Sequence, residues 1–247
     1  MSNYPLPDVQ VDNRCETCPV RHRAVCNALG DRGSHALSGI MNHKRYRRGQ
    51  LLWSETDEAQ FVAIVVKGMV KLHKATADGR QQIVALLFPS DFIGQPFSDE
   101  HQTSVEAATE VELCCFPRKD FERVLKQHPE LERELLKKST EDLEKARDWM
   151  VALGRMSAIE TVARFIFEMA RKSELTECVD SHQTSNLPTF ELPLSREEIA
   201  DCLGLTIETV SRNITTLQIN GLIKYIGVHT IEIRDPNALA KLADTEE

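Results

Sequence analysis

The stretch from Leu194 to Ile223, LSREEIADCLGLTIETVSRNITTLQINGLI, constrains the fold more than any other part of the sequence. Ser195 followed three residues later by Glu198 has the pattern of a capping box, which predicts that a helix begins at Arg196. Gly204 then allows a tight turn, because glycine adopts backbone conformations that other residues avoid. The stretch therefore predicts two short helices joined by a tight turn.

The second of these helices carries side chains suited to reading DNA bases. Thr206 can cap it, which places Glu208, Ser211 and Arg212 in its first two turns. The second helix of a helix-turn-helix enters the major groove, where Arg binds guanine, Glu accepts from cytosine and Ser reaches either kind of edge. The alternative is that Glu208 and Arg212, four residues apart, form only a surface ion pair.

Charge is distributed unevenly along the 247 residues, whose formal net charge is -8. Residues 155–247 hold nine Lys and Arg against fifteen Asp and Glu, whereas residues 14–48 hold eight Lys and Arg against two acidic residues. An acidic DNA-binding part cannot bind by bulk charge. We therefore expect its affinity to come from a few placed contacts, doubled by dimerisation.

Three of the seven cysteines form the spacing Cys15-x2-Cys18-x7-Cys26, close enough to converge on one metal centre. A zinc site or an iron–sulfur cluster needs a fourth thiolate, which Cys114 or Cys115 could supply. Nearby arginines favour thiolates and would also suit a thiolate switch that binds no metal. The spacing is therefore compatible with a zinc site, an iron–sulfur cluster or a site without metal. The remaining cysteines, Cys178 and Cys202, are expected to be ordinary small residues.

The chain between these features changes from strand patterns to helix patterns. Residues 60–66, 69–74, 81–88 and 103–116 read as strands separated by turns, which predicts a compact antiparallel β-roll or jelly roll. After Pro117, apolar residues recur at heptad spacing and predict a short coiled-coil seam that pairs with a second copy. The seam consists of Leu136, Leu143, Ala146, Met150 and Leu153. The alternative is that this stripe packs on its own domain.

Residues 158–172 predict another amphipathic helix, and 173–193 is a polar connector or short hairpin. Leu222 to Ile233 predicts a β-hairpin around Gly227, as in a winged helix-turn-helix. The predicted fold class is α+β, with an N-terminal antiparallel β-roll, a long dimerisation helix and a C-terminal winged helix-turn-helix. The boundaries are a cysteine-rich segment at 1–34, the roll at 35–117, the dimerisation region at 118–154 and the DNA-binding part at 155–247.

Apolar runs such as residues 83–88 are far shorter than the roughly 20 residues that a membrane helix needs. The first residues, MSNYPLPDVQ, lack the basic and apolar regions of a secretory signal. We therefore expect a cytoplasmic protein without a membrane partner.

The order of these parts, together with the segment LGLTIETVSR, resembles the FNR branch of the CRP/FNR transcription regulators. The cysteine spacing is most similar to alphaproteobacterial members of the FnrL or FnrN type, and the resemblance covers nearly all residues from Cys15 on. It implies an oxygen-labile 4Fe-4S cluster as the cofactor. The implied fourth ligand stands three residues before Pro117, which is Cys114, with Cys115 as the alternative. The implied ligand set is Cys15, Cys18, Cys26 and Cys114.

The resemblance also implies a regulator rather than an enzyme, which responds to oxygen and controls anaerobic or microaerobic genes. As a homodimer it would bind a palindrome like TTGAT-N4-ATCAA and contact RNA polymerase. Glu208, Ser211 and Arg212 match the residues with which the family contacts DNA bases, and Thr206 caps the helix that carries them.

Three other functions agree less well with the same residues. A cyclic-nucleotide regulator needs a Glu and an Arg to clamp the phosphate, but Gly94-Gln95 and Thr103-Ser104 stand at the corresponding places. A metal enzyme built in the roll needs clustered ligands, whereas His73 and His101 are isolated. An iron–sulfur electron carrier would leave the helix-turn-helix without a purpose.

Overall fold

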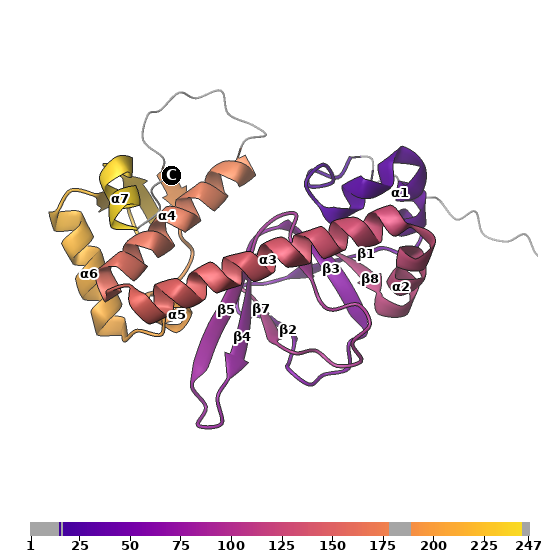
Figure 1. The fold of residues 1–247 in the computed structure, drawn as a ribbon, viewed down its shortest axis with the longest axis horizontal. Coiled ribbons are helices and arrows are strands. Elements are labelled where there is room, and N and C mark those ends of the chain that lie inside the picture. Colours follow the sequence, from indigo (N-terminus) through magenta and orange to yellow (C-terminus); the bar gives the residue numbers. More distant parts are fainter. Residues whose placement is uncertain (1–14, 16, 178–188, 244–247) are drawn as a thin grey trace, which may run out of the picture.

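The computed structural model describes residues 15, 17–177 and 189–243. Its N-terminal half is a roll of two antiparallel four-stranded sheets, ordered β1-β8-β3-β6 and β2-β7-β4-β5. The strands are β1 (Asn42–Tyr46), β2 (Leu51–Trp53), β3 (Phe61–Lys67), β4 (Val70–Ala75), β5 (Gln81–Leu87), β6 (Phe92–Ile93), β7 (Ser104–Ala107) and β8 (Val111–Pro117). The fold class expected from the sequence is confirmed (Figure 1).

Alternate residues of each strand face the space between the two sheets, because side chains along a strand point to opposite faces. The fully buried Val65, Val70, Val105 and Leu113 meet there in one apolar cluster with Trp53. The opposite faces of the sheets remain available to helices. This arrangement places the N-terminal cysteine segment against one sheet and the DNA-binding part against the other.

The single strand expected over residues 103–116 is wrong in one respect, since Ala108–Glu110 separates β7 from β8. The break lies where residues 108–110 contact the turn between β3 and β4. The Thr109 hydroxyl accepts a hydrogen bond from the Met69 backbone N–H at 2.9 Å, and a Cβ at Gly68 would clash with the Glu110 carbonyl oxygen. The turn between β3 and β4 therefore packs so closely that the chain bends here.

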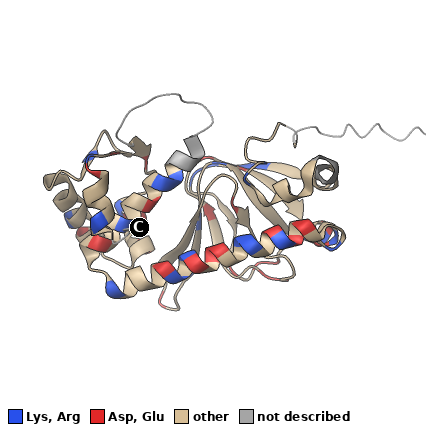
Figure 2. Cartoon of the chain, turned by 45° about the horizontal axis from the view of Figure 1, so that its top comes forward, with Lys and Arg blue, Asp and Glu red and all other residues tan. Residues whose placement is uncertain are grey.

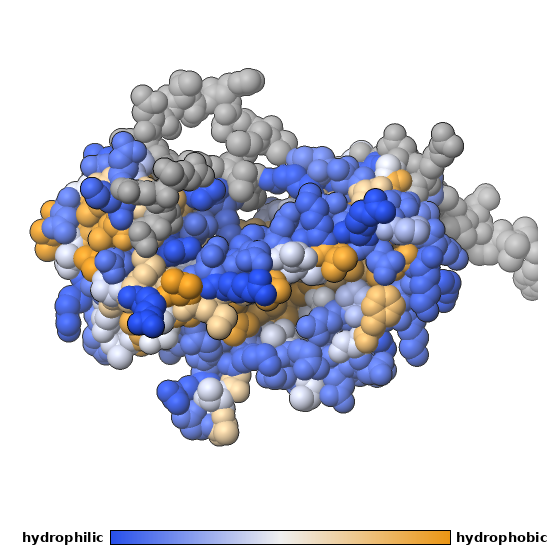
Figure 3. Space-filling model, viewed as in Figure 1, coloured by the Kyte–Doolittle hydropathy of each residue, from blue (hydrophilic) through white to orange (hydrophobic). Residues whose placement is uncertain are grey.

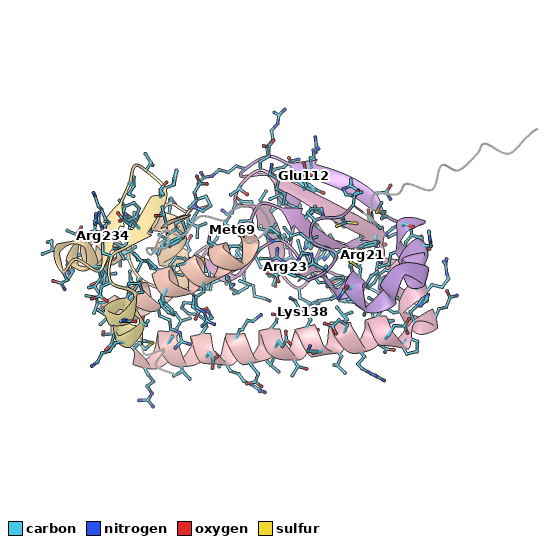
Figure 4. The ribbon with its side chains drawn as sticks, turned by 90° about the horizontal axis from the view of Figure 1, so that it is seen from above. Arg21, Arg23, Met69, Glu112, Lys138 and Arg234 are labelled. Atoms are coloured by element: carbon cyan, nitrogen blue, oxygen red, sulfur yellow. The ribbon has the colours of Figure 1, made fainter. Side chains whose placement is uncertain are left out.

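Among the described residues, the helical elements that flank the roll are η2 (Val25–Leu29), α1 (Gly30–Ser38), α2 (Arg118–Gln127) and the long α3 (Pro129–Arg155). Helix α3 runs across the front of the roll toward the C-terminal part (Figure 1), and its charged residues follow it along its length (Figure 2). Lys138 lies on the side of α3 that faces the roll, 3.6 Å from Asp91 (Figure 4). None of the helices in the described ranges combines the length and apolarity needed to span a membrane.

The C-terminal part comprises α4 (Ala158–Glu177), β9 (Thr189–Glu191), α5 (Arg196–Leu203), α6 (Ile207–Ile219), β10 (Ile223–Tyr225), β11 (Thr230–Ile233) and α7 (Pro236–Leu242). The expected hairpin is present as β10 and β11. A third strand, β9, pairs with β11 and was hidden in the polar connector. The expected helix end at residue 172 is wrong, since α4 continues to Glu177 through the first residues of the expected connector. Residues 178–188, which include Cys178, lie outside the described residues, as do residues 1–14.

Candidate functional site

The helix-turn-helix forms as the sequence predicts. The Ser195 side chain accepts from the Glu198 backbone N–H, and the Glu198 carboxylate accepts from the Ser195 backbone N–H, so the capping box is complete. Gly204 ends α5 in the left-handed region, at φ 62° and ψ 29°. Thr206 caps α6 by accepting from the Thr209 backbone N–H at 3.2 Å.

The predicted reading side chains lie on the exposed side of α6. Glu208 and Arg212 are exposed and Ser211 is half-buried, while Val210, Ile214 and Leu217 on the other side of α6 are buried. Backbone hydrogen bonds at the helix start, the Thr206 hydroxyl and the Arg212 charge lower the pKa of Glu208. Among the described residues no ion pair within 4.0 Å joins Glu208 to Arg212, and both side chains are exposed.

The cysteine site lies against the sheet that contains β8. Cys15, Cys18, Cys26 and Cys114 line one small pocket, whose other walls are largely apolar. Those walls include Val20, Leu37, Ile64, Val66 and Phe116, with Arg21 as the basic residue. The site therefore joins three segments: the loop before η2, η2 itself and strand β8.

Met41 lies between two of these thiols. Its sulfur is 3.6 Å from the Cys15 Sγ and 3.7 Å from the Cys114 Sγ. Nothing in the sequence singles out Met41, because a methionine before β1 is equally suited to filling a core. Figure 4 shows Arg21 and Arg23 beside the roll in the same region.

Cys115 faces away from this pocket. It belongs to the core between the two sheets, whereas Cys114 packs in the core with Cys18 and Cys26. The alternation of side chains along β8 thus separates two neighbouring cysteines. Of the two candidates for a fourth ligand, Cys114 is the one that the fold brings to the other three.

Burial disfavours the thiolate form at this site. It raises the pKa of Cys26 to about 11, with further contributions from Cys18 and Cys15 and an opposing one from Arg21. Burial also raises the pKa of Cys114, and the neighbouring cysteines add to the effect. Burial thus favours the protonated form of Cys26 and Cys114, and a metal centre has to displace these two protons.

The four cysteine sulfurs limit which metal centre the pocket could hold. Four cysteine sulfurs in a largely apolar pocket suit zinc or an iron–sulfur cluster, both of which select soft sulfur ligands once the thiols lose their protons. Within the described ranges, no group of three or more His, Cys, Asp and Glu side chains is arranged to hold a single metal ion. A 4Fe-4S cluster attaches each cysteine to a different iron, so its sulfurs need not converge on one point. The chemistry of the four sulfur donors therefore suits a cluster.

The predicted coiled-coil stripe is exposed on α3. Leu136, Leu143 and Met150 are 67%, 50% and 72% exposed, and Leu153 and Ala146 are exposed as well. Apolar side chains interrupt the polar surface along this helix (Figure 3). The alternative, that the stripe packs on its own domain, is wrong for this conformation of the chain.

Two family models match the chain: a cyclic nucleotide-binding domain over residues 43–128 and a Crp-like helix-turn-helix domain over residues 160–242. The chain is 40% identical to the transcriptional activator protein FnrL of Cereibacter sphaeroides, over 95% of this chain and 93% of that protein. A probable transcriptional activator of Rhizobium leguminosarum bv. viciae is also 40% identical, over 92% of each chain. The solved structure of FixK2 from Bradyrhizobium japonicum superimposes with a TM-score of 0.73 at 31% identity, covering 82% of this chain and 97% of that one.

The roll, the long helix and the exposed recognition helix define a transcription regulator that binds DNA, not an enzyme. The chain belongs to the CRP/FNR family of transcription regulators, in its FNR branch.

Proposed function

We propose that this regulator responds to oxygen through a 4Fe-4S cluster held by four thiolates. The ligands are Cys15, Cys18, Cys26 and Cys114. The observation that carries the proposal is the pocket in which these four thiols meet, although they come from separate segments. When bound, the cluster would supply reactivity toward oxygen, which zinc does not have.

The cysteine segment packs directly on the dimerisation helix. Cys26 lies in η2, whose Val25 and Leu29 share one buried core with Leu131 of α3. Ordering the ligands in the pocket orders η2, and η2 supports the N-terminal turns of α3. Loss of that order would loosen α3 and shift the chain away from the paired state, as expected for a ligand that biases a two-state element.

The DNA target follows from the same proposal. Two chains paired through α3 would present two recognition helices about one helical turn of DNA apart, which suits a palindrome like TTGAT-N4-ATCAA. Thr206, Glu208, Ser211 and Arg212 would make its contacts, and RNA polymerase would be the protein partner.

We infer that no cyclic nucleotide acts as the ligand. Where a clamp for the phosphate would stand, the Ser104 hydroxyl accepts from the Glu55 backbone N–H at 2.9 Å. Trp53 stacks on His101 at 4.1 Å and donates to the Thr103 carbonyl. Titration calorimetry with cyclic AMP tests this, and micromolar binding would contradict it.

The experiment that tests the oxygen response is purification without oxygen, followed by visible absorption, iron and sulfide analysis, and DNA titration before and after air. We expect a broad charge-transfer band that bleaches in air, with loss of specific DNA binding. Cys18→Ser should abolish both the band and the binding, whereas Cys202→Ala should keep the band. A colourless protein loaded with zinc would refute the cluster, and full DNA binding by Cys18→Ser would refute the coupling.

A further inference from the structure

The outer face of the sheet β2-β7-β4-β5 holds the first helix of the helix-turn-helix. Met69, Ile83 and Leu86 of the roll belong to the same buried apolar core as Ile199 and Leu203 of α5. Met69 lies where the roll meets the C-terminal part (Figure 4). The DNA-binding part is therefore docked on the roll, as well as being joined to it through α3.

A buried ion pair stands at the centre of this contact. Lys71 of β4 is only 8% exposed, and its ammonium lies 2.7 Å from the Glu198 carboxylate of α5. The same ammonium lies 2.9 Å from Glu106, which faces Lys71 across the β4–β7 pair. Burial opposes the charge of Lys71, but hydrogen bonds to Glu106 and Glu198 outweigh it and raise its pKa. Lys71 thus joins one carboxylate of the roll to one of the DNA-binding part.

Glu198 has two roles at once. One carboxylate oxygen accepts from Lys71, and the other accepts from the Ser195 backbone N–H to complete the capping box. Arg48 approaches that second oxygen at 3.7 Å. The ion pair is therefore attached to the first turn of α5, and any tilt of α5 against the roll would break one of these contacts.

A second polar contact reaches the turn between α5 and α6. The Gln82 side-chain amide of β5 donates to the Cys202 carbonyl at 3.0 Å. This carbonyl belongs to the last turn of α5, two residues before Gly204. The two contacts hold α5 at its beginning and near its end. Together they fix the angle of α5 on the roll as well as its distance from the roll.

The docking leaves the reading surface free. Thr206, Glu208 and Arg212 remain exposed on α6 while α5 rests on the roll. The contact therefore orients the helix-turn-helix without covering it. In contrast, the chain connection from α3 to α4 passes through Met156 in an extended conformation, at φ -82° and ψ 151°.

We propose that Lys71 and Glu198 are positioning residues, which set the angle of each helix-turn-helix on its roll and thereby the separation of the two recognition helices in the dimer. This inference rests on the proposed pairing through α3. Two helix-turn-helix units held at one separation select operators with one spacer length between the half-sites. If the two units can instead rotate about Met156, the dimer accepts several spacer lengths. It then loses part of the affinity gained by binding two half-sites together.

The test is Glu198→Gln in the full chain, prepared and assayed without oxygen. Glutamine at this position still completes a capping box, so the substitution removes the charge and keeps the cap. The probes are palindromes of the proposed half-site with the four-base-pair spacer or with one base pair removed or added, and a single half-site. We expect affinity for the four-base-pair palindrome to fall by on the order of ten-fold, with the half-site unchanged and discrimination between spacers reduced.

Glu106→Gln is the matched control. It removes a carboxylate from the same lysine but leaves the contact between roll and α5 in place, so spacer discrimination should stay as in the wild type. Because glutamine could still accept from Lys71, the double variant Lys71→Met with Glu198→Gln removes the pair completely and should show the larger loss. Thermal unfolding of each variant verifies that it folds.

Spacer discrimination that survives in the folded double variant would overturn the proposal, as would an equal loss on the half-site and the palindrome. A wild-type protein that binds all spacers alike would instead refute the paired arrangement in the proposed function. These two failures are therefore distinguishable.

Discussion

Cys114 and Cys115 follow one another along β8 and lie in different cores of the protein. Cys114 faces the pocket shared by Cys15, Cys18 and Cys26, whereas Cys115 is buried between the two sheets of the roll. Burial raises the pKa of Cys115 to about 11, and Lys44 lowers it by a smaller amount. Cys115 thus has the environment of a structural thiol, away from the proposed cluster.

Cys114→Ala should abolish the cluster, and Cys115→Ala should keep it. The first substitution removes a ligand, while the second shortens a core side chain and costs about 1 kcal/mol of stability. Iron and sulfide content with visible absorption, measured without oxygen, checks both variants. Retention of four irons by Cys114→Ala together with their loss in Cys115→Ala would reverse the ligand assignment.

Arg212→Ala should weaken binding to the palindrome by about 1–3 kcal/mol per half-site, because a bidentate contact to guanine is lost. The proposed cluster site lies in another part of the chain and should be unaffected. DNA titration at fixed salt checks the affinity, and a panel of operators changed at each base pair checks where specificity relaxes. If the variant shows the same base preferences as the wild type across the panel, Arg212 does not contact the bases.

Leu143→Glu should convert the dimer into monomers. Leu143 is half exposed in the single chain, and burying such a side chain contributes roughly 1.5–3 kcal/mol. Because a two-fold interface carries each substitution twice, the dissociation constant should rise on the order of a hundredfold. Sedimentation of the protein prepared without oxygen measures it.

The control for this change is Lys137→Glu, an exposed position of α3 that lies off the apolar stripe. It should leave the dimer intact. Dissociation by both variants would point to a general effect of added negative charge on α3, and not to the stripe.

Stability should decrease in mild acid through His73. Burial lowers the pKa of His73 below its ordinary value of 6.5, and the imidazole Nε2 is buried without a hydrogen-bond partner. As pH falls through 6.5, the unfolded chain therefore takes up a proton that the folded chain does not. The stability that depends on the neutral His73 ring is therefore fully present above pH 6.5, and the free energy of unfolding declines below that pH.

Thermal unfolding at about pH 7.5 and 5.5 measures this effect. The wild type should lose more stability between these values than His73→Gln. His229→Gln, at an exposed position of the wing, should follow the wild type. Identical pH dependence in the wild type and His73→Gln would contradict the prediction.

Local signals in the sequence predicted the helix-turn-helix closely. The capping box at Ser195 and Glu198, the turn at Gly204 and the cap at Thr206 each depend on residues within one or two helical turns, and each is confirmed. The seam on α3 was also readable, because helical periodicity alone places its members on one side.

Features that depend on distant parts of the chain could not be predicted. The break between β7 and β8 arises from Thr109 binding the turn at Met69. Strand β9 is too short to show a pattern and exists because it pairs with β11. Nothing in the sequence around Lys71 indicates that its partner stands 127 positions away.

Spacing along single segments was enough to predict the family, the two helices of the helix-turn-helix and the apolar stripe on α3. Three features depend on the packing of the whole chain: Cys114 rather than Cys115 faces the other cysteines, Met41 lies among the thiols, and Lys71 pairs with Glu198. The neighbours of a side chain across a sheet or between two domains are set by this long-range packing, which local spacing does not encode.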